Sequence, residues 1–383
     1  MISSVGAAAA GPTGEGSRLD MLATAAAERP DAPEVLLALA AALLAEQGHD
    51  VVGLSMQLYD QADGQTSFGS CCSLDDLHDA RRVAARIGIP HYVLNFEREF
   101  EEQVIANFIQ EYAAGRTPIP CAHCNSGLKF STLLERAEGL GAEALATGHY
   151  VRTERDPGTG RILLKRAADR SKDQAYFLFS LTQAQLARAI FPIGHASKDE
   201  VREHARRHDL PVAEKPDSQE LCFIPDDDYA SFLTSREPAL AAPGLVVDEH
   251  GRTVGAHDGI HRFTVGQRKG LGLSPSPDGM PRYVVALRPV DREVVVGPRA
   301  ALERTTLTAS SVNWMLGRPD GPLRVTAQIR HRHHPAAALV CPLDDPAGSR
   351  AHVVFDQPQT AITPGQAVVF YDGDIVIGGG WID

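Results

Sequence analysis

The sequence is poor in cysteine, has no long apolar run and shows no excess of positive charge. Six cysteines in 383 residues are too few for a disulfide-stabilised scaffold and indicate a reducing compartment. The longest apolar run, residues 35–45, is too short to span a bilayer. The first residues also lack the positive segment that opens a signal peptide. We therefore expect a cytoplasmic protein without a membrane partner.

The charge balance and the length limit the function further. A formal net charge of −12 argues against a protein that coats nucleic acid nonspecifically, although a local basic groove remains compatible with it. With 383 residues, 43% of them hydrophobic, the chain is long enough for two or three domains with buried cores.

The composition and the hydrophobic pattern change along the chain, and these changes predict its domain boundaries. Residues 1–30 are rich in Ala, Gly, Ser and Thr, contain no strand-like run and are expected to be disordered. Helical and strand-like runs alternate over residues 31–225, which predicts a doubly wound α/β domain. Residues 226–302 form a glycine-rich, β-type central region, and short β-type runs over residues 303–383 predict a β-barrel.

The strongest chemical signal is the pair Cys121 and Cys124, at the end of a proline-stiffened loop. The helical spacing that follows predicts that this Cys-x-x-Cys lies just before a helix N-terminus, where thiolate is favoured over thiol. A structural zinc site usually needs a second pair of ligands, and the sequence has no second Cys-x-x-Cys. A reactive thiol is therefore favoured over zinc.

Cys222 is the second signal, in a polar loop that enters an apolar run. Taken alone it is interpreted as a buried small apolar residue. Together with Cys121 and Cys124 it makes a three-cysteine site, which either passes sulfur between thiols or holds an iron–sulfur cluster with one open iron. The adjacent Cys71 and Cys72, like Cys341, are interpreted as structural.

Two basic clusters are ambiguous from spacing alone. The run from Arg330 to His334 could meet phosphates or, through its three histidines, a metal, but a solvated edge strand explains it equally well. Arg268 and Lys269, in a glycine-rich loop, allow the same two interpretations. Residues 170–174 are interpreted from spacing as a solvated loop.

From about residue 43 to residue 383 the chain resembles the tRNA-specific 2-thiouridylase family. The resemblance is based on ordered motifs at residues 48–54, 71–73, 115–125, 129–130, 146–150, 171–174, 176–178, 215–219, 222–223, 258–261 and 264–268. It implies an N-terminal adenylating α/β domain of the PP-loop type, a central tRNA-binding domain and a C-terminal β-barrel.

The resemblance also implies a reaction, the ATP-dependent thiolation of the wobble uridine of tRNA. ATP, with Mg, would adenylate the 2-carbonyl oxygen so that AMP can leave. Sulfur would arrive as a persulfide on Cys222, delivered by a cysteine desulfurase or a sulfur-relay protein. Cys124 would release it by forming a disulfide with Cys222. Some relatives could instead hold an iron–sulfur cluster on the three cysteines.

Binding residues are implied in the same way. Met56 and Gly148 would line the ATP site, and Ile119, Pro120 and Cys121 would face the target base. Ile119 stands where members commonly have Asn, and Cys121 where some have Asp. The remaining implied tRNA contacts are His149, Lys172, Asp173, Gln174, Arg330, His331 and Gln366.

One departure from the family lies before the first helix. Members have a strand and a glycine-rich S-G-G-x-D-S loop there, whose N–H groups hold the nucleotide phosphates. Residues 28–35 read ERPDAPEV, with no glycine and with two prolines that lack an N–H group. The sequence thus predicts that the loop is missing. Either a displaced start or reading frame has replaced it, or the chain is a catalytically defective homologue that binds tRNA.

Overall fold

The computed structural model describes residues 5–9, 21–23, 33–58, 74–208, 210, 221–224, 228–273 and 279–383. Its contacts divide the chain into two compact units. The first unit comprises Met1–Val104, Cys121–Asp227 and Asp374–Val376. The second comprises Ile105–Pro120, Asp228–Gly373 and Ile377–Asp383.

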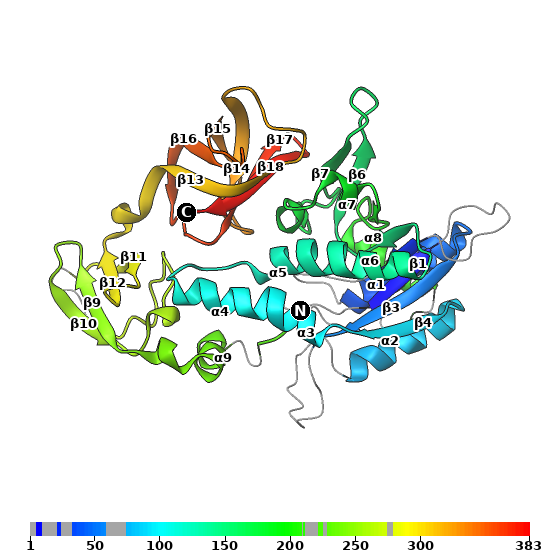
Figure 1. Ribbon diagram of the computed structural model, residues 1–383, viewed down its shortest axis with the longest axis horizontal. Coiled ribbons are helices and arrows are strands. Elements are labelled where there is room, and N and C mark those ends of the chain that lie inside the picture. Colours follow the sequence, from blue (N-terminus) through cyan, green and yellow to red (C-terminus); the bar gives the residue numbers. More distant parts are fainter. Residues whose placement is uncertain are drawn as a thin grey trace. The chain divides into compact units, whose positions relative to one another are not determined.

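The first unit is built on a sheet with the strand order β4-β3-β1-β2-β5-β8. Figure 1 labels β1, β3 and β4 of this sheet. The strands are β1 (Val5–Ala9), β2 (Met21–Ala23), β3 (Val51–Gln57), β4 (His91–Asn95), β5 (Ala144–Ala146) and β8 (Ala189–Ile190). Only β1 runs antiparallel to its neighbours. The carboxyl ends of the other strands therefore meet at one edge, where ligands bind in open α/β sheets.

Strands β1 and β2 correct the sequence analysis, which predicted no strand before residue 31. Residues 5–9 read VGAAA and have little intrinsic β propensity, but backbone pairing with β3 over the register from Val5↔Ser55 to Ala9↔Val51 overrides it. The other residues before 33, including the segment 28–32 before the first helix, lie outside the described residues.

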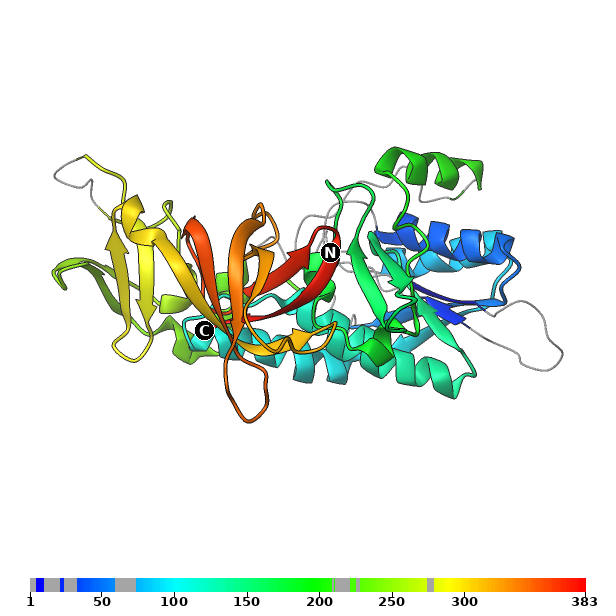
Figure 2. The same cartoon turned by 90° about the horizontal axis from the view of Figure 1, so that it is seen from above.

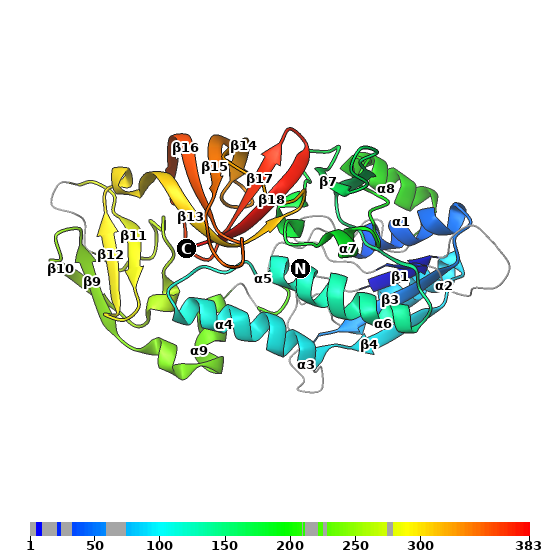
Figure 3. The ribbon, with the colours of Figure 1, turned by 45° about the horizontal axis from the view of Figure 1, so that its top comes forward.

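Helix α1 (Pro33–Glu46) is buried on several sides, which explains why its sequence is almost entirely Leu and Ala. Leu37 and Ala41 pack with β3 and with α2 (Leu74–Ile87). Leu36 and Leu39 pack towards Tyr150 and towards α8 (Lys198–Arg207), which lies beside α1 in Figure 3. The apolar run of residues 35–45 therefore belongs to a helix of the core and is buried on more than one side.

The two long helical stretches contain wide π-helical turns. One runs through α3 (Glu97–Phe100), η1 (Glu101–Ile105) and α4 (Ala106–Ala113) and is followed by Gly115 with φ +69°. The other runs through α5 (Pro120–His123), η2 (Cys124–Leu133) and α6 (Leu134–Gly139). Helical turns therefore begin at Pro120, a residue well suited to the first helical position. The expectation that both cysteines precede the helix is wrong, because Cys121 and Cys124 lie inside its first turns.

Smaller elements complete the first unit. They are the hairpin β6 (Val151–Arg155) and β7 (Ile162–Arg166), η3 (Ala175–Leu178) and α7 (Gln183–Leu186). Asp374 belongs to this unit and accepts hydrogen bonds from Arg152, at 2.7 Å, and from Arg170. Helix α8 begins with a capping box between Ser197 and Glu200.

The second unit starts with a small four-stranded sheet, ordered β10-β9-β12-β11. Its elements are α9 (Tyr229–Arg236), η5 (Pro238–Ala241), β9 (Gly244–Asp248), β10 (Thr253–His257), η6 (Ile260–Arg262), β11 (Tyr283–Arg288), β12 (Glu293–Gly297) and η7 (Arg299–Leu302). Val246, Phe263 and Val294 belong to its apolar core.

A closed six-stranded barrel follows in the second unit. The strands are β13 (Glu303–Trp314), β14 (Leu323–Gln328), β15 (Ala336–Pro342), β16 (Ala351–Thr360), β17 (Ala367–Asp372) and β18 (Ile375–Ile382). Their order is β13-β16-β15-β14-β17-β18, and pairing of β13 with β18 closes the ring. The later strands of the barrel are the orange and red ribbons of Figure 2. The predicted C-terminal barrel is therefore confirmed, and closure leaves no strand edge between β13 and β18 exposed.

Candidate functional site

Three buried thiols lie in the first unit. Cys124 is 0% exposed and Cys222 is 2% exposed, and Cys121 is also buried. None of the three forms a disulfide. The short segment of Cys222 is anchored by its neighbour Phe223, whose ring packs edge-on against Phe100 with centroids 5.6 Å apart. The motif at 215–219 lies outside the described residues, as do Cys71 and Cys72.

A buried ammonium group lies one helical turn beyond Cys124. Lys129 is 1% exposed, and its Nζ donates to Asn125 Oδ1 at 2.9 Å. Asn125 in turn donates from Nδ2 to the Phe177 carbonyl at 3.4 Å. Among the described residues no carboxylate lies within ion-pair distance of Lys129, and a buried cation without such a partner is costly.

The imidazole of His149 lies near this ammonium group and is 1% exposed. Its Nδ1 is 2.7 Å from Thr147 Oγ1, and its ring packs against Phe130 and Phe191. Its Nε2 is buried and has no hydrogen-bond partner among the described residues. Burial, helped by the charge of Lys129, holds the pKa of His149 well below its usual range. The ring is therefore neutral at pH 7, with one polar atom left to bind something else.

The residues expected at the ATP site lie at the carboxyl edge of the sheet. Met56 is the sixth residue of β3, and Gly148 follows β5 by two residues. A Cβ on Gly148 would lie 2.8 Å from Leu36 Cβ and 3.1 Å from the Leu36 carbonyl carbon. Only glycine therefore lets this loop approach the first turns of α1. An edge of parallel strands beside a helix N-terminus fits a nucleotide phosphate.

Lys172, Asp173 and Gln174 are built into the fold, so the interpretation of residues 170–174 as a solvated loop is wrong for the last two. Gln174 accepts from the Tyr150 N–H at 2.8 Å, and its own N–H donates to the Tyr150 carbonyl. The Asp173 carboxylate accepts from two backbone N–H groups, and burial raises its pKa above the usual range. Lys172 is half-buried.

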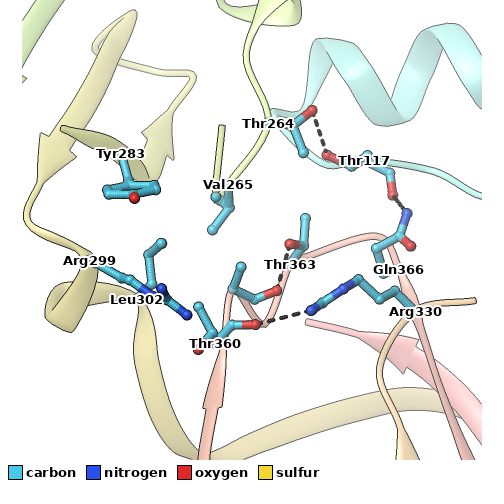
Figure 4. A pocket seen from close by; sticks show the side chains of 12 residues that line it. Thr117, Thr264, Val265, Tyr283, Arg299, Leu302, Arg330, Thr360, Thr363 and Gln366 are labelled. Atoms are coloured by element: carbon cyan, nitrogen blue, oxygen red, sulfur yellow. Dashed lines mark hydrogen bonds between the residues drawn. The ribbon is translucent and has the colours of Figure 1, made fainter. Parts of the chain in front are cut away.

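The other expected tRNA contacts belong to the second unit, where two of them share a cavity. Arg330 and Gln366 line a cavity of about 520 Å³ together with Thr117 (Figure 4). Gln366 Nε2 donates to the Thr117 carbonyl at 2.9 Å. His331 is half-buried beside them, and its carbonyl accepts from Gln328. Ile119 and Pro120 are buried residues of the same unit and do not line this cavity.

Three further residues stand out that the sequence analysis did not assign to a site. Lys129 interrupts the apolar run Leu128–Phe130, and a charged residue at a core-facing helical position was the available signal. Tyr283 and Arg299 line the cavity of Arg330. Neither has a local sequence pattern that marks it, because the cavity is assembled from distant segments.

No set of three or more His, Cys, Asp or Glu side chains is placed to hold a metal ion within the described ranges. Cys121, Cys124 and Cys222 are all in these ranges, so the iron–sulfur alternative gains no support from the fold. Over the same residues, no helix is both long and apolar enough to cross a bilayer.

Family models match three consecutive parts of the chain. Residues 35–226 match the tRNA methyl transferase HUP domain, and residues 231–298 match the tRNA methyl transferase PRC-barrel domain. Residues 304–382 match the aminomethyltransferase beta-barrel domain. The expected adenylating α/β fold, followed by a small central domain and a barrel, is therefore confirmed.

Full-length relatives agree with these matches. The tRNA-specific 2-thiouridylase MnmA of Geotalea uraniireducens is 50% identical over 349 residues, covering 90% of this chain and 91% of the relative. The proteins of the same name from Solibacter usitatus and Koribacter versatilis are each 51% identical, over 90% and 89% of this chain and 95% and 94% of their own length. The chain belongs to the tRNA-specific 2-thiouridylase family. The resemblance noted from the sequence is thus confirmed, and the 2-thiouridylase match extends over both units.

Proposed function

We propose that this chain is a tRNA-uridine 2-sulfurtransferase that thiolates the wobble uridine of tRNA in an ATP-dependent reaction in the cytoplasm. The observation that carries the proposal is the 50–51% identity to 2-thiouridylases along about nine tenths of the chain. The HUP-domain match and the buried cysteines of the first unit support it. The domains would be 31–225 for adenylation, 226–302 for tRNA binding and 303–383 for the barrel.

ATP would bind at the carboxyl edge of the sheet, lined by Met56 and Gly148. Its chemical contribution is to adenylate the 2-carbonyl oxygen of uridine, with Mg as the counterion, so that this oxygen becomes a leaving group. Gly148 lets the backbone of its loop lie against the first turns of α1. The N-terminus of a helix favours a phosphate, so this position suits a phosphate site. Lys129 and His149 would add a buried donor and a neutral ring to this unit.

The sulfur step would use two thiols. A cysteine desulfurase or sulfur-relay protein delivers a persulfide sulfur to Cys222. The thiolate of Cys124 attacks the Cys222 Sγ, a Cys124–Cys222 disulfide forms, and the outer sulfur leaves as hydrosulfide. In this step the Cys124 sulfur is oxidised by one electron and the outer sulfur is reduced by one, while the Cys222 sulfur exchanges one S–S bond for another. Hydrosulfide then displaces the activated oxygen at C2, and an external thiol restores the cysteines.

The tRNA would contact both units. Ile119, Pro120 and Cys121 would face the target base. Residues of the first unit that would touch the tRNA are His149, Lys172, Asp173 and Gln174, and those of the second are Arg330, His331 and Gln366. The buried position of His149 and Gln174 suits a base inserted from outside better than a surface phosphate.

A second candidate is a tRNA-binding homologue without catalysis, favoured by the glycine-free sequence of residues 28–35. Expression of the chain in cells lacking their own 2-thiouridylase separates the two. Mass spectrometry of the purified tRNA should detect 2-thiouridine with the wild-type chain and none with Cys124→Ser. If tRNA binds but neither 2-thiouridine nor tRNA-dependent AMP release is found, the homologue without catalysis is correct.

A further inference from the structure

The cavity of the second unit is formed by segments from six parts of the chain. Its walls are the loop of Thr117, the loop Thr264–Gly266, the η7 residues Arg299 and Leu302, and the β16–β17 connection. Tyr283 of β11 and Arg330 complete the lining (Figure 4). A volume of about 520 Å³ is within the usual range for small-ligand pockets.

The charge of the lining is positive in a chain whose net charge is −12. It contains two arginines and no acidic residue. Arg299 is exposed, and its side chain has no hydrogen bond or ion pair to any residue that the structure describes. Arg330 donates from Nη1 to the neutral Thr360 carbonyl at 3.1 Å. Two guanidinium groups without a carboxylate partner make a site for an anion such as a phosphate group, because a planar guanidinium can donate two parallel hydrogen bonds to a pair of phosphate oxygens.

The rest of the lining suits a planar, partly apolar group. Tyr283 is half-buried, so one part of its ring is available to the cavity, and Val265 and Leu302 add apolar surface. Thr264 and Thr363 add hydroxyl groups to the lining; the first accepts from Thr117 Oγ1 and the second donates to the Ala361 carbonyl (Figure 4). An aromatic face beside guanidinium groups is how proteins bind the unstacked bases of RNA.

The cavity is fixed before any ligand arrives. A Cβ on Gly266, whose φ is +92°, would lie 2.8 Å from Ala361 Cβ, so glycine allows these two walls to touch. The Thr117 loop is tied by its N–H group, which donates to the Pro364 carbonyl at 2.8 Å. A preformed site loses little conformational entropy on binding.

Two further cations continue from the wall formed by Thr264–Gly266. Arg268 and Lys269 are exposed, and among the described residues neither side chain has an ion-pair partner. The positive surface is therefore longer than one phosphate group, as expected for a polymer with a repeating charge.

We infer that this cavity receives one unstacked nucleotide of the tRNA, with Arg299 and Arg330 on its phosphate and Tyr283 against its base. The inference rests on the proposed function, which supplies tRNA as the ligand. It adds Tyr283 and Arg299, and the capture of a flipped-out nucleotide, to the contacts expected of Arg330 and Gln366.

The test measures the Kd for a tRNA transcript with a wobble uridine at several salt concentrations. Arg299→Ala should weaken binding about tenfold and reduce the slope of log K against log salt by about one, because one phosphate contact is lost. Tyr283→Ala should weaken binding about tenfold without a change in slope, and Tyr283→Phe should stay within about twofold of wild type. Arg324→Ala is the matched control, because Arg324 is an exposed barrel arginine paired with Asp356 outside the cavity.

Two results would overturn the inference. One is binding within about twofold of wild type for both Arg299→Ala and Tyr283→Ala. The other is an equal loss in Tyr283→Ala and Tyr283→Phe, since stacking needs only the ring. Thermal unfolding of each variant identifies losses of binding that are due to misfolding. If Arg299→Ala is misfolded, Arg299→Lys replaces it in the test. Lysine keeps the charge but cannot donate two parallel hydrogen bonds, so binding by Arg299→Lys that equals wild type would count against the phosphate contact. The assay of 2-thiouridine with the wild-type chain tests the proposed function separately, so a failure there leaves the binding result interpretable.

Discussion

The first unit buries its reactive groups, with Cys124, Lys129 and His149 all almost inaccessible, whereas the second unit leaves Arg299 exposed at a cavity. Sulfur transfer through a persulfide needs water and stray thiols kept out, and burial provides that protection. A tRNA is far larger than any pocket, so its phosphates are best met by accessible cations. Under the proposed function, the first unit would carry out the sulfur chemistry and make some of the tRNA contacts, and the exposed cations of the second unit would meet further phosphates of the tRNA.

Removal of the thiols should give the largest loss of thiolation activity. If activity is kept, the first unit does not use its buried cysteines for chemistry, and the difference between the two units disappears. Cys124→Ser and Cys222→Ser should each lower 2-thiouridine formation on the order of 10³-fold or more, because each removes a sulfur that must form a bond. Binding of tRNA should change little. The measurement is mass spectrometry of tRNA after incubation with ATP and a sulfur donor.

Cys341→Ser is the matched control, since Cys341 lies in barrel strand β15 and is only partly buried. It should retain full activity. Retention of activity by Cys222→Ser would refute the two-thiol step, and the chemistry would then need another sulfur carrier.

Replacement of the buried ammonium group should give the next largest effect. Lys129→Met keeps the length of the side chain and removes a charge that has no carboxylate partner among the described residues. Thiolation should fall about 10²-fold, as when one electrostatic donor is deleted from an active site. Stability should change little, because the removal of a buried charge offsets the loss of the hydrogen bond to Asn125 Oδ1.

The measurements are the thiolation rate and the midpoint of thermal unfolding. A Lys129→Met protein that is strongly destabilised but active when folded would mean that the ammonium group has a structural role. The contrast between an enclosed chemical site and an open binding site would then lose one of its supports.

Much of the fold followed from local patterns, but not all of it. Local sequence patterns predicted the elements that the structure contains. They are the alternating helices and strands, the Leu- and Ala-rich α1 and the short strands of the barrel. Strands β1 and β2 were missed because long-range backbone pairing determines them, and no alternation of side chains marks them. The start of the helix at Pro120 was missed because a Pro-Ile-Pro sequence is more typical of a loop.

The candidate site was predictable to the extent that it has sequence motifs. Cys121, Cys124 and Cys222 were found from residue type and spacing. Lys129 was not assigned to the site from the sequence, because its isolation from carboxylates appears only in three dimensions. Tyr283 and Arg299 come together through the packing of β11, η7 and the barrel, which no local pattern encodes.

A methyl group at the carboxyl edge of the first sheet should have an effect of intermediate size. Gly148→Ala places a Cβ 2.8 Å from Leu36 Cβ and 3.1 Å from the Leu36 backbone, so α1 must shift. We expect a loss of about 1–3 kcal/mol in the free energy of unfolding, typical of overpacking, and weaker ATP binding. Urea unfolding and equilibrium nucleotide binding measure the two effects.

Gly139→Ala supplies the control for this substitution. Gly139 is the last residue of α6, and a Cβ there would meet no atom within 4 Å. Alanine should therefore leave stability unchanged or raise it by about 0.4–1 kcal/mol. Equal behaviour of the two variants would mean that the edge at Gly148 is not as tight as the structure has it.

The smallest expected effect is a loss of stability at low pH, which we expect in both units. His91 has Nε2 at 2.8 Å from Ser55 Oγ, and burial, with a contribution from Arg81, lowers its pKa to about 4. Below pH 6.5 the His91 ring binds a proton in the unfolded chain but stays neutral in the folded chain. The free energy of unfolding is therefore unaffected by His91 above pH 6.5 and decreases as the pH falls from 6.5 towards 4. Between pH 7 and pH 5, His91→Asn should lose about 1 kcal/mol less stability than wild type, allowing for solvent screening of the half-buried ring. Urea unfolding at both pH values measures this, with the exposed His250→Asn as control.

Burial also lowers the pKa of His257 and His261 in the second unit, so both units should lose stability in acid. The contrast between the units therefore lies in their sites and not in how each core treats a histidine.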